Sequence, residues 1–222
     1  QAMELGIEYA RLADADLLIA TDPDCDRVGI AVPDGNGGYA LFSGNEVGAM
    51  LLQYICEQRT ARGTMPKNPI AVKTIVTTDL TVPIAEEYGV ELRNVLTGFK
   101  FIGEKIKEFE ASGEYTYLFG FEESNGYLAG TYARDKDAVV ASMLIAEMSC
   151  WYKTKGKNIY EAMQDLFREY GYFSEKVISH TVEGFDGPER MAKRMAEIRE
   201  NPPKDFGGLE VKAVRDYKSG EI

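Results

Sequence analysis

The sequence predicts an α/β fold, in which helices flank a β-sheet. Stretches with strand composition alternate with stretches of helical periodicity along residues 15–155, and this alternation is typical of α/β domains. Apolar runs rich in Leu, Ile and Val, such as residues 17–20 and 28–32, have the composition of buried strands. We therefore expect a core built around a sheet rather than a bundle of helices.

Composition restricts the partners that the chain can have. Its 222 residues are 45% hydrophobic, which suffices for one or two cores. The net charge of -11 argues against a nucleic-acid partner and against an anionic membrane surface. The three cysteines are scattered and none is in C-x-x-C spacing, so we expect free thiols in a reducing, cytoplasmic environment. No apolar run approaches membrane-spanning length, and the start has no signal-peptide pattern.

Local signals predict the elements of the first half in order. Good helix formers with an apolar stripe occupy residues 1–13, and Ser43 and Glu46 have the spacing of a capping box at the start of another helix. The buried stripe expected for this helix is Val47, Met50, Leu51, Tyr54 and Ile55. The further expected elements are strands at 17–20, 28–32, 39–42, 70–77 and 90–95, a turn at 33–38 and a helix at 82–88.

The second half continues the alternation up to about residue 155. We expect a helix opening at Thr97, a strand at 115–120 that leads into a loop at 121–127, and a helix at 138–152. After Gly156 the character changes, and a separate small α+β unit is expected. Its predicted elements are helices at 159–170 and 191–200 and strands at 172–182 and 209–217.

The loop between the first two predicted strands is the clearest candidate site. Asp22, Asp24 and Asp26 stand at alternate positions, and Arg27 follows at once. Carboxylates that are forced together repel one another unless a cation or a proton relieves them. A hard divalent cation with oxygen ligands, Mg²⁺, is therefore the expected occupant.

Two simpler interpretations of this loop explain less. A solvated turn accounts for Asp and Pro, but not for three acids and an arginine between two buried strands. An EF-hand would need Gly where Arg27 stands and Glu where Pro33 stands, so we reject it.

Two other regions carry candidate ligand-binding side chains. Phe99, Ile102, Ile106 and Phe109 form the apolar stripe of one predicted helix, which leaves Lys100 off that face near the N-terminal end. A lysine there is explained by a bound anion shared with free backbone N–H groups, and equally by a solvated surface side chain.

Loops beyond the carboxyl ends of strands commonly bind ligands in α/β folds. Glu122, Glu123 and Ser124 follow such a strand, and they could bind sugar hydroxyls or form a polar turn. Residues 134–137 precede the helix at 138, and their charges form either a solvated cap or contacts to phosphate and hydroxyl groups.

Taken together, five stretches resemble the α-D-phosphohexomutases, the phosphoglucomutase and phosphomannomutase group. They occur in the family's order and cover most of residues 15–150: Thr21–Arg27, Gly44–Met50, Thr97–Lys105, Gly120–Tyr127 and Arg134–Asp137. The resemblance implies a mixed sheet flanked by helices. It also implies an isomerase of the phosphotransferase type, which interconverts hexose 1-phosphate and hexose 6-phosphate through a phosphoserine, a bisphosphorylated sugar and Mg²⁺.

The resemblance also implies a role for each matching residue. Asp22, Asp24 and Asp26 would hold the metal, and Arg27 would steady the phosphoryl group in flight. The substrate contacts would come from Thr97, Gly98, Lys100, Glu122, Ser124, Arg134 and Lys136. Among these, Glu122 and Ser124 would hold the sugar's 3- and 4-hydroxyls, and Lys136 could act in proton transfer. Phosphoryl transfer depends mainly on positioning and charge stabilisation. The only histidine, His180, lies outside the motifs, so a carboxylate or a lysine is expected as the base.

Two family motifs are missing from the sequence. No serine is followed by His-Asn-Pro, and no Arg-x-Ser-Gly-Thr phosphate loop is present, since Ser219-Gly220-Glu221 does not supply it. We therefore expect an internal piece of a longer protein that is inactive without its remaining domains. The expected parts are the end of domain two with the metal loop at 1–40, the sugar-binding domain three at 41–155, and the start of domain four at 156–222.

Two alternative functions remain at this stage. One is a phosphatase of the haloacid-dehalogenase type with Asp22 as nucleophile, although Asp26-Arg27 stands where that family has Asp-x-Thr or Asp-x-Val. The other is a non-catalytic module that binds sugar phosphates.

Overall fold

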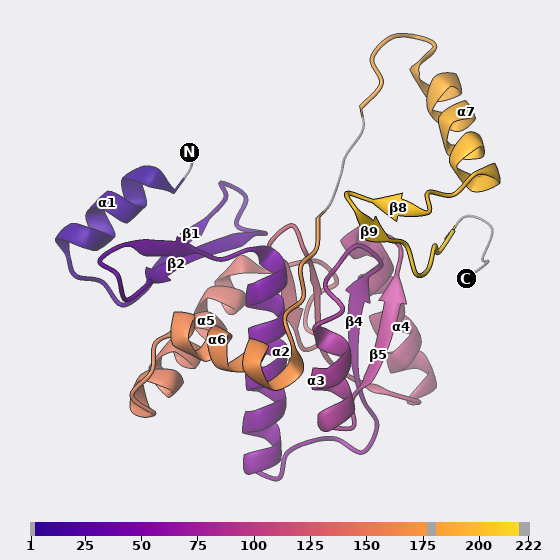
Figure 1. The fold of residues 1–222 in the computed structure, drawn as a ribbon. Helices are drawn as coiled ribbons and strands as arrows, with labels where there is room; N and C mark the ends of the chain where they lie inside the picture. The colour runs from indigo at the N-terminus through magenta and orange to yellow at the C-terminus, as the bar shows by residue number, and fades with distance from the viewer. Residues whose placement is uncertain (1–2, 177–180, 218–222) are drawn as a thin grey trace. The chain divides into compact units, whose positions relative to one another are not determined.

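The computed structural model describes residues 3–176 and 181–217. They form two compact units, which divide between Glu175 and Lys176. The first unit contains the elements that carry the candidate site (Figure 1).

The main sheet of the first unit is mixed, as the resemblance implies. Its strand order is β5-β4-β6-β7. β4 (Pro69–Thr74) pairs in parallel with β5 (Glu91–Val95) and with β6 (Thr116–Glu122), whereas β7 (Gly126–Ala129) pairs with β6 in antiparallel orientation. The carboxyl ends of β4, β5 and β6 therefore share one edge of the sheet.

The β6–β7 hairpin corrects the expectation of a loop at 121–127. Its turn, residues 123–125, is closed by the pairing of Glu122 with Gly126. Asn125 has φ 65°, the left-handed conformation that Asn tolerates better than most residues. The dipeptide Asn125-Gly126 is a hairpin signal, but the apolar pattern of the returning strand is only a few residues long and does not by itself indicate a strand.

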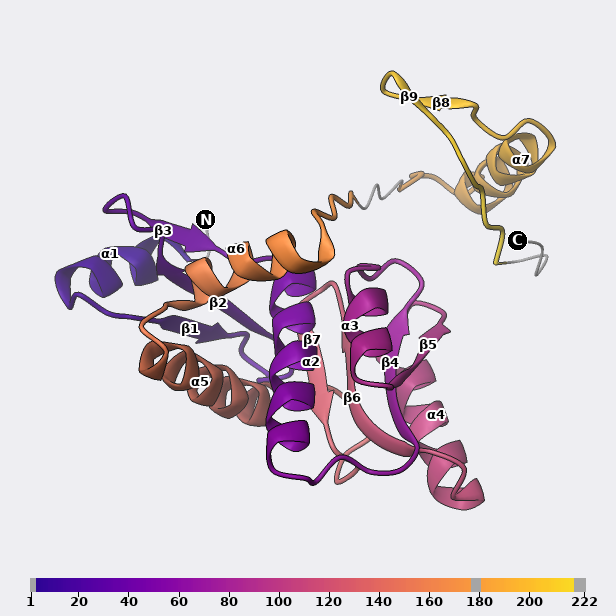
Figure 2. The ribbon, with the colours of Figure 1, turned by 60° about the horizontal axis from the view of Figure 1, so that its bottom comes forward.

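Helices cover both faces of this sheet, so the unit is an α/β/α sandwich (Figure 2). α4 (Phe99–Ser112) packs on the face that carries Ile70 and Val72, and α2 (Gly44–Ala61) packs on the face that carries Ala71. The alternation of side chains along β4 produces this division. α3 (Thr81–Glu87) contacts α2 and β5, and α5 (Ala138–Thr154) contacts α2 and β7.

The predicted helical stripes are confirmed in α2 and α4. All five residues expected to be buried in α2 are buried, and the Ser43–Glu46 capping box is formed. In α4, the four predicted apolar residues are buried and Lys100 is exposed. Periodicity was informative here because each helix has one face on the sheet and one face in solvent.

A small antiparallel sheet carries the acidic loop. Its order is β1-β2-β3, formed by β1 (Leu18–Thr21), β2 (Val28–Pro33) and β3 (Tyr39–Leu41). α1 (Glu4–Leu12) contacts β1, and its stripe of Leu5, Tyr9 and Leu12 is exposed. Buried Val28, Ile30 and Val32 join β2 to the core that α2 lines.

The separate unit that was expected after Gly156 begins later in the chain. α6 (Ile159–Tyr170) is the predicted helix, but its buried face belongs to the same core as α2 and α5, and the two units divide only after Glu175. The predicted parental domains at 1–40, 41–155 and 156–222 stay a prediction.

The second unit contains little regular structure among its described residues. α7 (Gly187–Glu200) starts before the predicted helix, and β8 (Asp205–Phe206) pairs with the short β9 (Leu209–Glu210). The strand predicted at 209–217 is therefore mostly wrong. No strand forms in the described part of 172–182, while residues 177–180, including His180, and Ser219-Gly220-Glu221 lie outside the described residues. Apolar side chains such as Phe206 and Leu209 are exposed here, so little burial supports longer strands.

None of the helices in the part of the chain that the structure describes is long and apolar enough to cross a membrane.

Candidate functional site

The turn between β1 and β2 gathers the three predicted metal ligands. One carboxylate oxygen from each of Asp22, Asp24 and Asp26 lies within 4.8 Å of the others. The side chain of Asp22 closes the turn: its Oδ1 accepts the backbone N–H groups of Asp26 and Arg27, each at 3.1 Å. Cys25 adopts φ 57°, which permits this tight path.

Backbone hydrogen bonds favour the ionised form of Asp22. The backbone N–H of Arg27, with further hydrogen bonds from Asp26, holds the pKa of Asp22 below its usual range although desolvation opposes the shift. Carboxylate oxygens at this spacing match the ligand preference of hard divalent cations such as Mg²⁺. The donor set therefore fits the ion that the resemblance implies.

Backbone hydrogen bonds connect the acidic turn to the hairpin and to the start of α5. The N–H of Val28 donates to the carbonyl of Asn125 at 3.1 Å, and the N–H of Ala138 donates to the carbonyl of Cys25 at 3.1 Å. Residues more than 90 positions apart in the sequence are thus joined next to the carboxylates, and the acidic turn lies beside the 123–125 turn.

Lys136 brings a cation into this site. Its Nζ lies 2.5 Å from Oδ2 of Asp26, and its side chain is only 12% exposed. Burial disfavours the charge, but the hydrogen bond to Asp26 and the charge of Asp135 raise the pKa of Lys136 above its usual value. The aliphatic part of the Lys136 side chain packs against Gly126, where a Cβ atom would lie 2.4 Å from Cδ of Lys136. Lys136 therefore stays protonated beside the acidic turn.

Glu122 joins the Thr97–Gly98 loop to the hairpin. Oε1 of this buried carboxylate accepts the N–H of Gly98 at 2.9 Å. Burial raises the pKa of Glu122, while the Gly98 N–H and the charges of Lys136 and Arg27 oppose the shift. Gly98 has φ 123°, a conformation that favours glycine. Thr97, directly before Gly98, is exposed, and Ser124 lies in the hairpin turn.

Three residues that the sequence does not mark as site residues, Thr74, Thr77 and Gly44, surround Glu123. Oε2 of Glu123 lies 3.3 Å from the hydroxyl oxygens of Thr74 and Thr77, at the end of β4. On the other side of the turn, a Cβ atom on Gly44 would lie 2.1 Å from the carbonyl oxygen of Glu123. In the sequence, these contacts are indicated only by the Glu122-Glu123 doublet and by a glycine at the start of a helix. Neither signal identifies the residue that is contacted.

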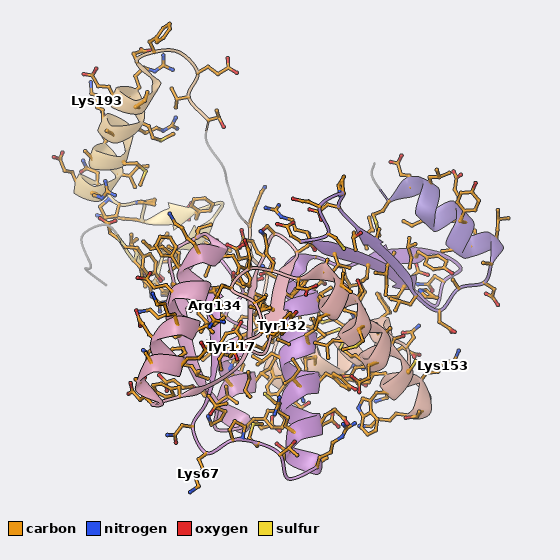
Figure 3. All side chains as sticks on the ribbon, turned by 180° about the vertical axis from the view of Figure 1, so that it is seen from behind. Lys67, Tyr117, Tyr132, Arg134, Lys153 and Lys193 are labelled. Atoms are coloured by element: carbon orange, nitrogen blue, oxygen red, sulfur yellow. The ribbon has the colours of Figure 1, made fainter. Side chains whose placement is uncertain are left out.

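Two of the predicted site residues are held elsewhere. The guanidinium of Arg134 pairs with Glu110 of α4 and donates to the carbonyls of Thr131 and Ala133; Figure 3 labels Arg134 beside that helix. Nζ of Lys100 lies 4.9 Å from the ring centroid of Phe101. The structure thus brings together the three aspartates, Arg27, Lys136, Glu122 and Gly98. In the part of the chain that the structure describes, neither Arg134 nor Lys100 forms a hydrogen bond or an ion pair with them.

Comparison with known proteins identifies the family of this chain. The family model described as phosphoglucomutase/phosphomannomutase, alpha/beta/alpha domain III, matches residues 43–170. A phosphoglucomutase of Staphylococcus aureus strain USA300 is 37% identical over 222 residues, which are all of this chain and 39% of that protein. The chain therefore spans about two fifths of the length of this curated relative.

Solved structures support the fold. A phosphoglucomutase/phosphomannomutase family protein from Burkholderia thailandensis aligns with a TM-score of 0.62 and 15% identity over 95% of this chain and 39% of that chain. An N-acetylphosphoglucosamine mutase from Aspergillus fumigatus, in complex with GlcNAc-6P and magnesium, aligns with a TM-score of 0.51 and 15% identity over 72% of this chain and 36% of that chain. With the family model covering more than half of its residues, this chain belongs to the phosphoglucomutase/phosphomannomutase family.

Proposed function

We propose that this chain supplies the metal loop and the sugar-binding loops of a phosphohexomutase, which interconverts hexose 1-phosphate and hexose 6-phosphate. The observation that carries the proposal is the three-aspartate cluster, joined through Lys136 to the hairpin of Glu122. Transfer of a phosphoryl group on a hexose requires positive charge near the phosphoryl group and polar side chains that position the sugar.

Each residue then has a distinct task. Asp22, Asp24 and Asp26 hold Mg²⁺, which supplies positive charge to the phosphoryl oxygens when it is bound. Arg27, whose side chain is half exposed and lies 3.8 Å from Asp26, stabilises charge on the transferring group. Lys136 holds or delivers a proton near the same carboxylate.

The hairpin and its neighbouring loop bind the sugar. Glu122 accepts hydrogen bonds from sugar hydroxyls, and Ser124 donates to or accepts from an adjacent hydroxyl. Thr97 and Gly98 contact the substrate from the neighbouring loop. Lys100 and Arg134 would contact the substrate's phosphate only after leaving Phe101 and Glu110.

The phosphoserine, with its ligand to the metal, would come from the remaining domains of a longer parent. No serine in the sequence has the Ser-His-Asn-Pro context, and the relatives are more than twice as long as the aligned region. The chain by itself is therefore expected to bind Mg²⁺ and hexose phosphates weakly and to be inactive as an isomerase.

Calorimetric titration with MgCl₂ tests the metal site. Asp24 is exposed, so Asp24→Asn removes one ligand charge with little effect on the fold. We expect at least a tenfold loss of Mg²⁺ affinity, about 1.4 kcal/mol. Asp16→Asn is the matched control, because Asp16 is an exposed carboxylate paired with Lys153 outside the cluster. Equal affinities of the two variants would contradict the metal assignment.

A turnover assay tests the remainder of the proposal. Glucose 1-phosphate should not be isomerised by this chain alone, while the full-length parent should convert it with Mg²⁺ present. Robust isomerisation by residues 1–222 would refute the need for further domains. Hydrolysis of phosphate monoesters that disappears in Asp22→Asn would instead support an aspartyl phosphatase.

A further inference from the structure

A cavity on the first unit includes none of the residues of the candidate site. Its volume is about 540 Å³, within the range of ligand pockets in proteins. It is bounded by the second half of α2, by the ends of β6 and β7, and by α5. Figure 2 shows α2 between α5 and the strands of the sheet.

The floor of this cavity is apolar. Ile55 of α2, Leu118 of β6, Ala129 of β7 and Leu144 of α5 contribute to its lining. Tyr54 of α2 and Glu147 of α5 form part of the wall. Such a surface favours a ligand with an apolar body.

Polar donors gather along the α2 side of the same cavity. Nε2 of Gln58 is buried and has no hydrogen-bond partner among the described residues. Arg59 and Arg62 are exposed beside it, and neither pairs with a carboxylate in the described part of the chain. The guanidinium of Arg59 donates a hydrogen bond to the carbonyl oxygen of Thr64, at 3.4 Å.

Charge complementarity favours an anionic ligand at this rim. Arg59 and Arg62 both line the cavity, and among the described residues no carboxylate neutralises either guanidinium group by an ion pair. Guanidinium and amide N–H groups are donors that suit a carboxylate or phosphate oxygen. Their position at the rim of an apolar cavity points to a ligand with one acidic end.

We propose that this cavity binds a small organic anion, with its apolar body on Ile55, Leu118 and Leu144 and its acidic head group between Gln58, Arg59 and Arg62. The head group is a carboxylate or a phosphate monoester, since both offer oxygens to the same three donors. The inference is independent of the proposed mutase function because the two sites share no residue.

Titration with 8-anilinonaphthalene-1-sulfonate, an apolar fluorophore with one anionic group, tests the site. We expect saturable fluorescence enhancement that weakens at least tenfold in Arg59→Glu/Arg62→Glu. The matched control is Arg11→Glu, a charge reversal on α1 away from the cavity. Circular dichroism establishes that each variant is folded, which is expected because these arginines are exposed. Equal binding by the double variant and the control would overturn the proposal, as would the absence of saturable binding.

Competition then defines the ligand class. Octanoate or phenyl phosphate should displace the fluorophore, and the more effective competitor identifies the head group. Displacement by inorganic phosphate at the same concentration would contradict a role for the apolar floor. In ¹H–¹⁵N spectra, the amides of Gly130 and Leu144 should shift while that of Asp24 does not; shifts confined to residues outside the cavity would also refute the site.

Discussion

Nζ of Lys136 lies 2.5 Å from Oδ2 of Asp26, so a lysine from the segment before α5 neutralises one carboxylate of the acidic turn. The three aspartates therefore already have a resident counter-ion. A divalent cation entering the cluster would share Asp26 with this ammonium group, which lowers the affinity of the cluster for the metal.

Lys136→Met should bind Mg²⁺ more tightly than the unmodified chain does. The substitution keeps an unbranched side chain over Gly126 and removes the positive charge beside Asp26. We expect about a tenfold gain in affinity, about 1.4 kcal/mol, as is reasonable for loss of one charge at short range near a protein surface. Calorimetric titration measures the change.

The matched control for this substitution is Lys153→Met. Lys153 forms an equally short pair with Asp16, but both side chains are 66% exposed and lie outside the acidic turn; Figure 3 labels Lys153 on α5. Its removal should leave Mg²⁺ affinity unchanged. A loss of affinity in Lys136→Met would mean that the lysine organises the turn rather than competing with the ion.

Glu122→Gln should change the pH dependence of stability. Burial raises the pKa of Glu122 in the folded chain above its ordinary value of 4.5, so the folded state holds this proton to higher pH than the unfolded state. The stability that the proton contributes is present below the ordinary pKa and is lost as pH rises through the raised folded pKa. Glutamine cannot titrate, and its side-chain oxygen still accepts the Gly98 N–H.

Calorimetric melting of both proteins between about pH 4 and about pH 7 checks this expectation. The Tm of Glu122→Gln should exceed that of the unmodified chain by an amount that grows as pH rises, since other titrating groups are common to both proteins. A Tm difference that does not change with pH, or that is largest at acid pH, would mean that burial of Glu122 does not cause the difference.

Local patterns were sufficient for the helices and for the acidic turn. The stripe that ends at Phe109 and the Ser43–Glu46 capping box depend on neighbours within a few residues, and such signals survive in a single sequence. Asp22, Asp24 and Asp26 are also close in sequence, so their proximity required no knowledge of the fold.

The contacts that complete the site depend on distant segments. Lys136 meets Asp26, and Glu122 meets Gly98, only because the fold brings the β1–β2 turn of one sheet next to the β6–β7 hairpin and the loop before α4. No local pattern encodes that arrangement. For the same reason Arg134, which carries a charge in a matching motif, could not be separated in advance from residues that reach the cluster.

Gly44→Ala should destabilise the chain through the hairpin turn. A Cβ atom there would lie 2.1 Å from the carbonyl oxygen of Glu123 and 2.7 Å from the backbone nitrogen of Asn125. Because both are backbone atoms, the N-terminus of α2 or the turn must shift, at a cost of about 1–3 kcal/mol. Urea unfolding measures the loss.

Gly29→Ala provides the comparison for Gly44→Ala. Gly29 lies on β2, and a Cβ atom there would meet nothing within 4 Å. Its free energy of unfolding should stay within about 0.5 kcal/mol of the unmodified value. Similar losses at both positions would show that the close approach of α2 to the turn is not what Gly44 provides.

The buried Lys73 should respond differently to loss of its charge and to loss of its partner. Its side chain is 1% exposed, and Nζ donates to the carbonyl oxygen of Thr77 at 2.8 Å and to Oδ1 of the half-exposed Asp79 at 2.9 Å. Asp79→Ala leaves a buried ammonium with one protein acceptor, so we expect a loss of about 2 kcal/mol. Lys73→Met keeps the volume and removes the charge, so its cost should be below about 1 kcal/mol.

Urea unfolding of both single variants and of Lys73→Met/Asp79→Ala separates these effects. Once the lysine is gone, Asp79 is an ordinary surface carboxylate, and the double variant should be about as stable as Lys73→Met alone. The coupling energy between the two sites should therefore nearly equal the cost of Asp79→Ala. If the two losses simply add, Asp79 stabilises the 75–80 loop by itself and the ion pair with Lys73 contributes nothing to the fold.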